Sequence, residues 1–550
     1  MADDIVAGAG RLKAWLIDEA LPMWGGVGFD AAQASFVERL DVSGAPLLDA
    51  PRRAMVQARQ VYVFAQAALA GWRPQGQSLA LAAADNLIAR YHATDAAPGW
   101  IFSADAAGRP HDTRRDLYAY AFVLFGLAWA WRLAPKRRYL EAARATLADL
   151  DRRFAVIGGG YHSALPADVN ELRQNPHMHL FEALLSWFAA TGEADFLARA
   201  DRLRDLMVTR FVQPSGILCE RFDGAWRPLA GEAGRICEPG HHCEWAWLLA
   251  QHARLAGVVS DSLAATLAVR AMRHGVGADG LLVDELRDDG HVVRASRRVW
   301  PQTEAIKAHA AAFEAGDVAT AAGAARLIGR LFDVFLDRPV RGGWIDHVDA
   351  EGAPLVSFMP ASTLYHLMGA AVEADRVWGR QRLRPAALLD RDGVLNVDHG
   401  YVHRIETLEL MLGAARAVRR LNEAGYLVIV ASNQSGIARG YYTLDDAHRF
   451  NAALRERLAE EGARIDAFYL APYHPDGVVE PYARPHDDRK PGPGMLRRAL
   501  AEWPVDAARS FLIGDKDSDL EAAQRAGLPG HLYRGGDLDV FVRDVLAQPG

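Results

Sequence analysis

The sequence predicts two domains of different class: an all-helical toroid, followed by an α/β domain with a parallel, Rossmann-like sheet. Three observations support this division. The chain has 550 residues, which is more than one hydrophobic core usually holds. Residues 1–378 carry apolar side chains at helical spacing in segment after segment, with almost no strand-like alternation. In residues 386–550, short apolar runs alternate with helical segments, which indicates strands joined by crossover helices.

The first domain is expected to contain roughly eleven or twelve helices. Alanine and leucine are abundant, several segments end near glycine, and no long heptad repeat indicates a coiled coil. Many helices of similar length favour a closed toroid whose site lies at one mouth, where loops meet helix ends. The clearest helical segments are residues 52–72, 116–134, 136–154, 178–192 and 241–257. Residues 379–385, rich in arginine and ending in proline, are predicted to be a linker.

The composition is that of an ordinary globular protein and argues against some partners. Half of the residues are hydrophobic, 24% are charged and the net charge is −7, which argues against general binding to nucleic acid or to a membrane surface. The N-terminus has no apolar signal core, and the most apolar run, residues 118–131, is too short to span a membrane. Three cysteines give no disulfide framework. These features predict a cytoplasmic location and leave open whether the chain forms a homo-oligomer.

In the second domain, polar side chains follow three predicted strands. Asp390, Ser432 and Asp515 each end an apolar run, and such strand ends meet at one edge of a parallel sheet. With Asp392 and Asp519 nearby, four carboxylates would repel one another, and a hard cation such as Mg²⁺ would offset that repulsion.

Groups that suit a phosphate accompany these acids. The stretch SNQSG offers small donors, among them Ser432 and Asn433, together with backbone N–H groups. Lys490 supplies positive charge for the negative charge that develops on a phosphoryl group. The alternative is that the acids belong to a surface loop without chemistry.

Four stretches resemble the ordered motifs of the haloacid dehalogenase superfamily: DRDGVLN, ASNQSG, RKPGPGM and GDKDSD. More narrowly, they resemble its heptose-bisphosphate and histidinol-phosphate phosphatases, over residues 385–545. The resemblance implies that Asp390 is the nucleophile and Asp392 the general acid/base. It also implies that Ser432 and Lys490 hold the phosphoryl oxygens. The implied ligands of Mg²⁺ are Asp390, the backbone carbonyl of Asp392, Asp515 and Asp519. The short insert at 397–411 implies a minimal cap.

One departure from these phosphatases concerns zinc. They carry a zinc-stabilised loop before the lysine, and its four cysteine and histidine positions correspond here to Ala471, Tyr473, His486 and Asp488. Without cysteine, zinc is not expected there. Since that loop helps shape substrate choice, the substrate does not carry over with the motifs. Zinc is also not expected at Cys237, Cys243, His241 and His242, because no second cluster completes a tetrahedral site.

In the first domain, histidines and acids cluster in a few stretches. His179 with Glu182 and His241 with Glu244 are both H-x-x-E pairs, so each pair shares one helix face. Three interpretations compete: histidines with only structural roles, a di-metal centre between the two pairs, and acid/base chemistry on a sugar, with aromatic rings stacking the substrate.

Seven stretches in order resemble the N-acylglucosamine 2-epimerase superfamily over residues 10–376. They run from RQVYVFAQAA through NPHMHLFEA, EPGHHCEWAWLL and WPQTEAI to STLYHL. The resemblance implies an (α/α)6 barrel that needs no metal or nicotinamide. It implies proton removal beside a carbonyl, through a cis-enediol, with His241 and His366 as general base and acid. Glu244 is expected to orient His241. The remaining implied positions are Arg59, His179 and Glu244 for sugar binding or support, and Trp300, Glu304 and Trp344 for the pocket wall.

The two domains together predict a bifunctional carbohydrate enzyme acting on a small sugar phosphate. The preferred hypothesis is isomerisation of fructose 6-phosphate and mannose 6-phosphate, coupled to Mg²⁺-dependent dephosphorylation. Heptose phosphates are an alternative substrate class. A barrel that only binds sugar, or one that processes glycosides with two carboxylates, also stays open at this stage.

Overall fold

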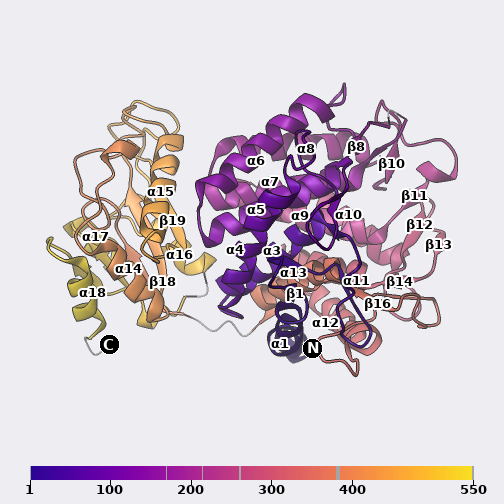
Figure 1. Cartoon of the computed structure of the whole chain (residues 1–550). Coiled ribbons are helices and arrows are strands. Elements are labelled where there is room, and N and C mark those ends of the chain that lie inside the picture. The colour runs from indigo at the N-terminus through magenta and orange to yellow at the C-terminus, as the bar shows by residue number, and fades with distance from the viewer. Residues whose placement is uncertain are drawn as a thin grey trace. The chain divides into compact units, whose positions relative to one another are not determined.

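The structure is a computed structural model that describes residues 2–168, 170–213, 215–258, 262–379, 384–503 and 505–547. The chain divides into two compact units, one of residues 1–190 and 194–380, the other of residues 191–193 and 381–550 (Figure 1). Of the predicted linker, residues 379–385, positions 380–383 lie outside the described residues.

The first unit is the expected (α/α)6 barrel, with an inner and an outer ring of helices. Inner helices are buried on nearly every side, as in α5, whereas outer helices such as α12 bury one apolar stripe and expose the rest. The inner helices are α3 (Ala54–Leu69), α5 (Leu117–Leu133), α7 (Gln174–Thr191), α9 (Pro239–Ala256), α11 (Val299–Glu314) and α13 (Ala361–Trp378). The outer helices are α1 (Ala2–Trp15), α4 (Gly76–Tyr91), α6 (Arg137–Asp149), α8 (Ala194–Leu206), α10 (Ser262–Gly275) and α12 (Thr320–Leu331).

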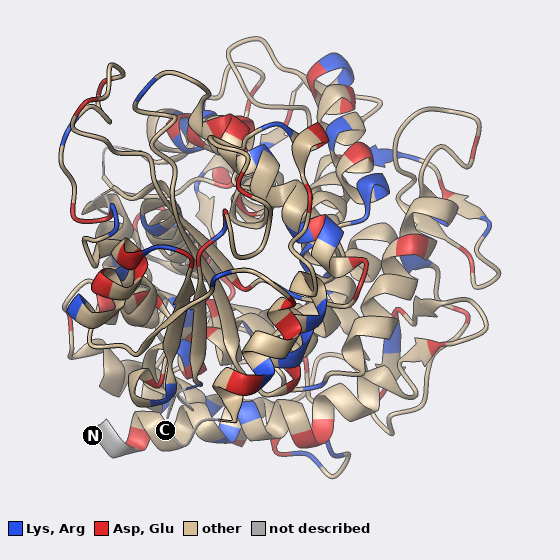
Figure 2. Cartoon of the chain, turned by 90° about the vertical axis from the view of Figure 1, so that its left-hand side faces the viewer, with Lys and Arg blue, Asp and Glu red and all other residues tan. Residues whose placement is uncertain are grey.

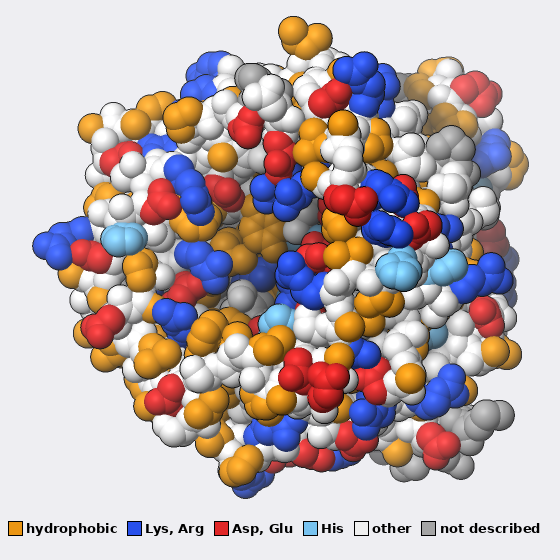
Figure 3. All heavy atoms as spheres, turned by 90° about the vertical axis from the view of Figure 1, so that its right-hand side faces the viewer, with side chains coloured by type: hydrophobic (Ala, Val, Ile, Leu, Met, Phe, Trp, Pro, Cys, Tyr) orange, Lys and Arg blue, Asp and Glu red, His pale blue; other side chains and the backbone are white. Residues whose placement is uncertain are grey.

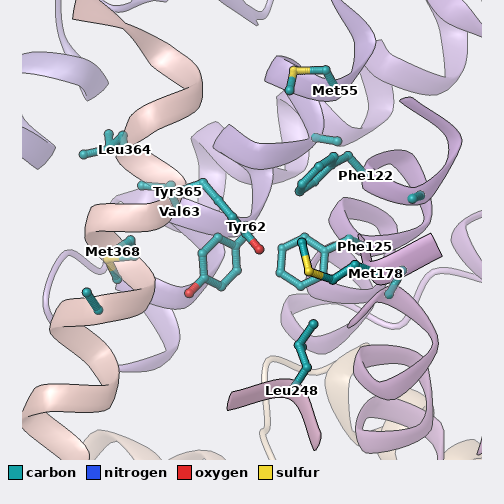
Figure 4. Packing of buried hydrophobic residues seen from close by; sticks show 14 of the residues in the cluster. Met55, Tyr62, Val63, Phe122, Phe125, Met178, Leu248, Leu364, Tyr365 and Met368 are labelled. Carbon is teal, nitrogen blue, oxygen red and sulfur yellow. The ribbon is translucent and has the colours of Figure 1, made fainter. Parts of the chain in front are cut away.

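Aromatic side chains fill the space between the inner helices. Figure 4 shows Tyr62, Phe122, Phe125 and Tyr365 turned toward one another, and the ring of Tyr62 lies 5.0 Å from Phe125 and 5.4 Å from Tyr365. Gly126 permits the close approach of α5 to α3, because a Cβ there would lie 2.8 Å from the carbonyl oxygen of Ala58. The barrel axis is therefore a packed core below its site.

A belt of short strands, which the sequence did not predict, surrounds one end of the barrel. Six strands of two or three residues end at most one residue before an inner helix: β4 (Arg52–Arg53), β7 (Arg115–Asp116), β9 (Leu172–Arg173), β11 (Ile236–Cys237), β14 (Arg297–Arg298) and β16 (Phe358–Pro360). Their antiparallel partners are β5 (Ser103–Ala104), β8 (Ala164–Leu165), β10 (Arg221–Phe222), β12 (Glu285–Arg287), β15 (His347–Val348) and β3 (Arg39–Asp41). Strands this short show no readable alternation, which explains why the prediction missed them.

The belt marks the mouth of the barrel. Every inner helix starts at this end, so residues in the first turns of several helices converge there. The belt lies on the right-hand side of the barrel in Figure 1, and Figure 3 shows the molecule from that side. A hollow is visible on this face, with hydrophobic side chains on its floor and basic, acidic and histidine side chains around it.

The second unit is an α/β domain with a five-stranded sheet in the order β19-β18-β17-β20-β21, all parallel. Hydrophobic clusters cover both faces of the sheet, one with α14, α15 and α18 and the other with α16 and α17. The strands are β17 (Ala386–Leu389), β18 (Leu427–Asn433), β19 (Ala467–Ala471), β20 (Phe511–Gly514) and β21 (Gly530–Leu532). The helices are α14 (Ala414–Glu423), α15 (Leu444–Ala459), α16 (Gly494–Glu502), α17 (Asp517–Arg525) and α18 (Leu538–Leu546).

This topology confirms the predicted Rossmann-like domain. Strand β17 lies at the centre with β18 and β20 on its two sides, so the ends of the three strands bearing Asp390, Ser432 and Asp515 are neighbours. Figure 2 shows acidic and basic segments together at the upper ends of the strands. Residues 397–411 form one short 3-10 turn, η6 (Ile405–Thr407), and no cap domain.

Candidate active sites

Lys490 organises the site at the edge of the α/β sheet. Its ammonium lies 3.0 Å from Asp390 Oδ1 and 2.6 Å from Asp519 Oδ1, and it donates a hydrogen bond to the carbonyl of Ala431 at 2.7 Å. The side chains of Lys490, Asp390 and Asp519 are all buried. The structure thus brings together the predicted nucleophile, the predicted cation and an acid from the last motif.

The same contacts set the charge of Asp390. Burial raises the pKa of its carboxyl to about 7, with Asp519 and Asp392 adding to the rise and Lys490 opposing it. A nucleophilic carboxylate must be ionised, so further positive charge beside Asp390 would favour the reactive form.

The acids at this edge fit a divalent metal ion. Oxygen atoms of Asp390, Asp515 and Asp519 lie within 4.8 Å of one another, and hard oxygen ligands are those that Mg²⁺ prefers. Asp515 Oδ1 is buried without a hydrogen-bond partner among the described residues. Gly393, at φ +86°, leaves room for this carboxylate, because a Cβ there would collide with Asp515 Oδ2.

Asp392 is held by three side chains that the sequence analysis did not single out. Arg391 donates to both of its carboxylate oxygens, at 3.0 and 2.9 Å. Gln434 donates to Oδ2 at 2.8 Å and Asn396 to Oδ1 at 2.9 Å. Gln434 and Asn396 lie within the quoted motifs, but the sequence of a motif does not show which side-chain atoms contact Asp392.

Ser432 and Asn433 differ in what they contact. Ser432 is buried and accepts a hydrogen bond from Gln434 at 2.8 Å, which leaves its hydroxyl proton for a phosphoryl oxygen. Asn433 was expected to contact phosphate, but its amide bonds the backbone N–H and C=O of Lys490, both at 2.9 Å. Asn433 therefore positions Lys490.

The loop that corresponds to the zinc loop is held by other contacts. The rings of Tyr473 and His486 stack at 3.8 Å with an interplanar angle of 11°. Asp488 lies 3.3 Å from the guanidinium of Arg498 and 3.8 Å from His486. Two of the four corresponding positions thus form an aromatic stack, and a third forms an ion pair.

In the barrel, His241 and His366 face the same tryptophan. His241 is in the first turn of α9 and His366 is in α13, and their rings lie 5.0 and 5.8 Å from the partly exposed ring of Trp300. Trp300 itself begins α11. Three inner helices therefore bring the two predicted catalytic histidines around one aromatic surface.

Each of these histidines has its own carboxylate. Nδ1 of His366 lies 2.8 Å from Glu304, and Nδ1 of His241 lies 3.0 Å from Glu220. The expectation that Glu244 orients His241 was wrong. Glu244 lies one turn along the same helix, but its carboxylate lies 3.9 Å from His179. Glu220 comes from the loop before α9, where no motif pointed to it.

The surroundings give the two histidines opposite charge preferences. Burial disfavours the charged form of both. Glu220 and Glu238 outweigh that effect at His241 and raise its pKa to about 9. At His366 burial dominates and lowers the pKa to about 3, with Arg59 and Lys307 opposing the charge and Glu304 favouring it. These preferences are the reverse of the expected roles, in which His241 was the base and His366 the acid: the surroundings favour the protonated form of His241 and the neutral form of His366.

The other predicted barrel residues form a buried polar floor. Arg59 donates to the Tyr118 hydroxyl at 2.7 Å and its guanidinium lies 4.0 Å from the ring centroid of Phe122. His179 Nδ1 lies 3.1 Å from Glu182. Trp344 was expected in the pocket wall, but it is 2% exposed and stacks on Trp24 at 5.3 Å. Trp344 belongs to the core.

The contacts of the barrel acids bear on the metal alternative. His179, His241 and His366 each lie in a group of acids and histidine close enough to share a cation. In all three groups the histidine Nδ1 already contacts a carboxylate. The two H-x-x-E pairs make different contacts: His179 contacts Glu182 of its own motif, whereas His241 contacts Glu220 from outside its motif. Acids thus orient all three histidines through Nδ1, a contact that histidine makes both as an acid/base group and as a metal ligand.

The two units thus differ in class: one is a helical barrel with two histidines around an aromatic ring at its mouth, and the other is a parallel-sheet domain with acids and a lysine at its strand ends. The model of the N-acylglucosamine 2-epimerase (GlcNAc 2-epimerase) family matches residues 35–370, and the chain belongs to this family. A model described as HAD-hydrolase-like matches residues 488–541. The chain therefore joins sugar isomerase or epimerase activity with phosphatase activity.

Individual relatives match the two units separately. Mannose-6-phosphate isomerase of Rhizobium meliloti is 37% identical over 68% of this chain and 98% of its own length. D-glycero-beta-D-manno-heptose-1,7-bisphosphate 7-phosphatase of Rhodopseudomonas palustris is 48% identical over 30% of this chain and 92% of its own. The structure of cellobiose 2-epimerase from Spirochaeta thermophila covers 67% of this chain and 96% of its own, with 26% identity and a TM-score of 0.61.

The helices in the described part of the chain were also compared with the length and hydropathy of a membrane span. None of them is long and apolar enough to cross a bilayer.

Proposed function

We propose that the chain is a bifunctional enzyme in which the barrel isomerises a sugar phosphate and the second domain removes the phosphate. For the barrel, fructose 6-phosphate and mannose 6-phosphate are the preferred pair, supported by the similarity to a mannose-6-phosphate isomerase. The observation that carries the isomerase assignment is the placement of His241 and His366 against one aromatic ring, in surroundings that raise the pKa of His241 and lower that of His366.

In the proposed isomerisation, His366 takes a proton from C1 of the ketose while His241 gives one to the carbonyl oxygen at C2. The product is a cis-enediol. His241 then recovers the proton of the C1 hydroxyl, and His366 delivers its proton to C2, which gives the aldose. One acid and one base are needed at the same pH, and the opposite charge preferences of the two histidines meet that need.

In the proposed dephosphorylation, the Asp390 carboxylate attacks phosphorus and Asp392 protonates the sugar oxygen as the P–O bond breaks. Asp392 then takes a proton from water, whose oxygen attacks the aspartyl-phosphate and releases phosphate. Ser432 and Lys490 hold the phosphoryl oxygens. Asp390, Asp515 and Asp519 would hold Mg²⁺, which when bound supplies positive charge to offset that of the phosphoryl group and the acids.

The two reactions support each other. Aldose and ketose phosphates differ little in free energy, so isomerisation alone stops near a balanced mixture. Hydrolysis of the phosphate is effectively irreversible in water and would draw the mixture toward the dephosphorylated product.

A second candidate is action on heptose phosphates. It is favoured by the 48% identity of the second unit to a heptose-bisphosphate phosphatase. The Tyr473–His486 stack in the loop that helps shape the phosphatase pocket is consistent with either substrate.

The test is a substrate screen with each site disabled in turn. Full-length protein, Asp390→Asn and His366→Gln are incubated with Mg²⁺ and each hexose or heptose phosphate, and phosphate release and sugar identity are measured. Asp390→Asn should lose phosphate release but keep isomerisation, and His366→Gln the reverse. Matched controls are Asp445→Asn, an exposed acid of the second unit, and His252→Gln, a buried histidine paired with Asp201.

The mechanism of the barrel is tested in the Asp390→Asn protein in deuterated water. We expect deuterium at C2 of the aldose formed from the ketose, because the proton on His366 exchanges with solvent while the enediol is bound. Complete absence of deuterium from C2 after prolonged incubation would exclude an enediol with an exchanging base, and wild-type rates of phosphate release from Asp390→Asn would exclude the nucleophile.

A further inference from the structure

A lysine is buried beneath the barrel site, and neither the motifs nor the proposed mechanism uses it. Lys307 lies on α11, one turn after Glu304, and is 2% exposed. Its ammonium lies 2.6 Å from Glu304 Oε2 and 3.7 Å from the ring centroid of Trp247 on α9. Lysines are rarely so buried unless they are paired, so this position calls for a functional reason.

Glu304 connects Lys307 to the proposed catalytic base. One oxygen of Glu304 lies 2.6 Å from Lys307 Nζ, and the other lies 2.8 Å from Nδ1 of His366. All three side chains are buried. An ammonium, a carboxylate and an imidazole therefore form a continuous row that ends at the pocket.

The charged and titratable groups around this row come from every neighbouring inner helix. Glu244 on α9 and Glu182 on α7 raise the pKa of Lys307, and Arg59 on α3 lowers the pKa of His366. The charges of Glu182 and Glu304 raise the pKa of Tyr62 and Tyr365. Burial raises the pKa of Glu182 and Glu244, and at both of them it outweighs the opposing charge of Lys307. Glu304 differs, because Lys307 and His366 outweigh its burial and lower its pKa.

We propose that Lys307 is a positioning residue that keeps Glu304 ionised and thereby fixes the tautomer of His366. An ionised carboxylate can only accept a hydrogen bond, so Nδ1 of His366 must carry the proton. Nε2 is then left with its lone pair, ready to take a proton from the sugar. This inference rests on the proposed role of His366 as the base.

Removal of the Lys307 ammonium is expected to impair one step, the uptake of a proton by His366. Without Lys307, Glu304 would resemble Glu182 and Glu244 and hold a proton. A protonated carboxyl donates to Nδ1 of His366, which moves the imidazole proton to Nε2 and blocks the base. The fold and the substrate contacts of the pocket would stay, so turnover should fall more than substrate binding.

The experiment compares Lys307→Met, Lys307→Arg and wild type as full-length proteins. Selective ¹⁵N-histidine labelling reports the tautomer of His366, whose signals are identified by their loss in His366→Gln. Isomerisation kcat and KM are measured on the same proteins across pH. Lys13→Met is the control, because it removes an ion-paired lysine of the same unit that is partly exposed and pairs with Asp375.

We expect wild-type His366 to carry its proton on Nδ1. Lys307→Met should show the other tautomer, a kcat about 100-fold lower with KM little changed, and an acid limb of kcat/KM moved to higher pH. Lys307→Arg should restore part of kcat, and Lys13→Met should match wild type. A wild-type proton on Nε2 overturns the proposal, and so does a Lys307→Met protein that keeps the wild-type tautomer.

The outcomes separate this proposal from the proposed function. If Lys307→Met does not fold, Lys307→Gln takes its place in the comparison, because it removes the charge but keeps a polar side chain; a wild-type tautomer there would overturn the proposal. If wild type turns over no sugar, the proposed function fails, while the ¹⁵N signals of His366 still report whether Glu304 is ionised.

Discussion

Glu220 is predicted to keep His241 protonated, and Glu220→Gln tests this directly. The acids around His241 raise its pKa from 6.5 to about 9 against the effect of burial, a difference of about 3 kcal/mol at 1.36 kcal/mol per pKa unit. The substitution removes the nearest charge, at 3.0 Å, while Glu238 remains. The pKa of His241 should then fall by about two units or more.

The direction of the pH effect follows from the proposed role of His241 as an acid. An acid must be protonated, so isomerisation falls as pH rises through its pKa. In wild type this basic limb should lie near pH 9. In Glu220→Gln it should lie near or below neutral pH, so the loss of kcat/KM should be large at pH 8 and small at pH 6.

The assay is a pH profile of kcat/KM for isomerisation, with the phosphatase disabled by Asp390→Asn so that phosphate release does not distort it. Glu232→Gln is the control, because Glu232 is an exposed acid of the same unit. A basic limb that stays at the wild-type pH in Glu220→Gln would refute the assignment of His241 as the acid.

Three further predictions concern single contacts. Asn433→Ala should lower phosphatase kcat about 10-fold or more by loosening Lys490, with isomerisation unchanged; equal phosphatase rates would show that the backbone bonds to Lys490 do not matter. Gly393→Ala should raise the Mg²⁺ concentration needed for half-maximal phosphate release, because the new Cβ displaces Asp515 and φ +86° disfavours alanine; an unchanged Mg²⁺ titration would contradict this. Gly126→Ala should lower the unfolding free energy of the barrel by about 1–3 kcal/mol through its clash with Ala58, measured by urea denaturation; an unchanged midpoint would indicate that α5 can shift away from α3.

The sequence was informative where function and local structure coincide. Asp390 and Asp515 stand at the ends of apolar strands, so their meeting follows from the geometry of a parallel sheet. The (α/α)6 barrel likewise follows from helical periodicity together with the ordered motifs. Lys490 was found because its positive charge suits a phosphoryl group and because the stretch RKPGPGM resembles a motif of the superfamily.

Contacts between distant segments were harder to predict. Glu220 reaches His241 from a loop whose path depends on the β9–β10 pairing, and two-residue strands leave no pattern in the sequence. Spacing along one helix suggested Glu244 as the partner of His241, but a shared helix face does not determine which neighbour a carboxylate turns to. Asn433 and Trp344 show the same limit, since residue type and motif membership do not fix a side-chain contact.

The strand belt has a consequence for how the chain can be made. The ring closes only when β16 pairs with β3, which joins residues 358–360 to residues 39–41. During synthesis, β3 must remain an open strand edge until more than 300 further residues have followed it, and open edges invite pairing with other chains. The phosphatase domain, by contrast, pairs strands within its own 170 C-terminal residues. A chaperone that shields nascent chains should therefore improve the yield of the barrel more than that of the phosphatase.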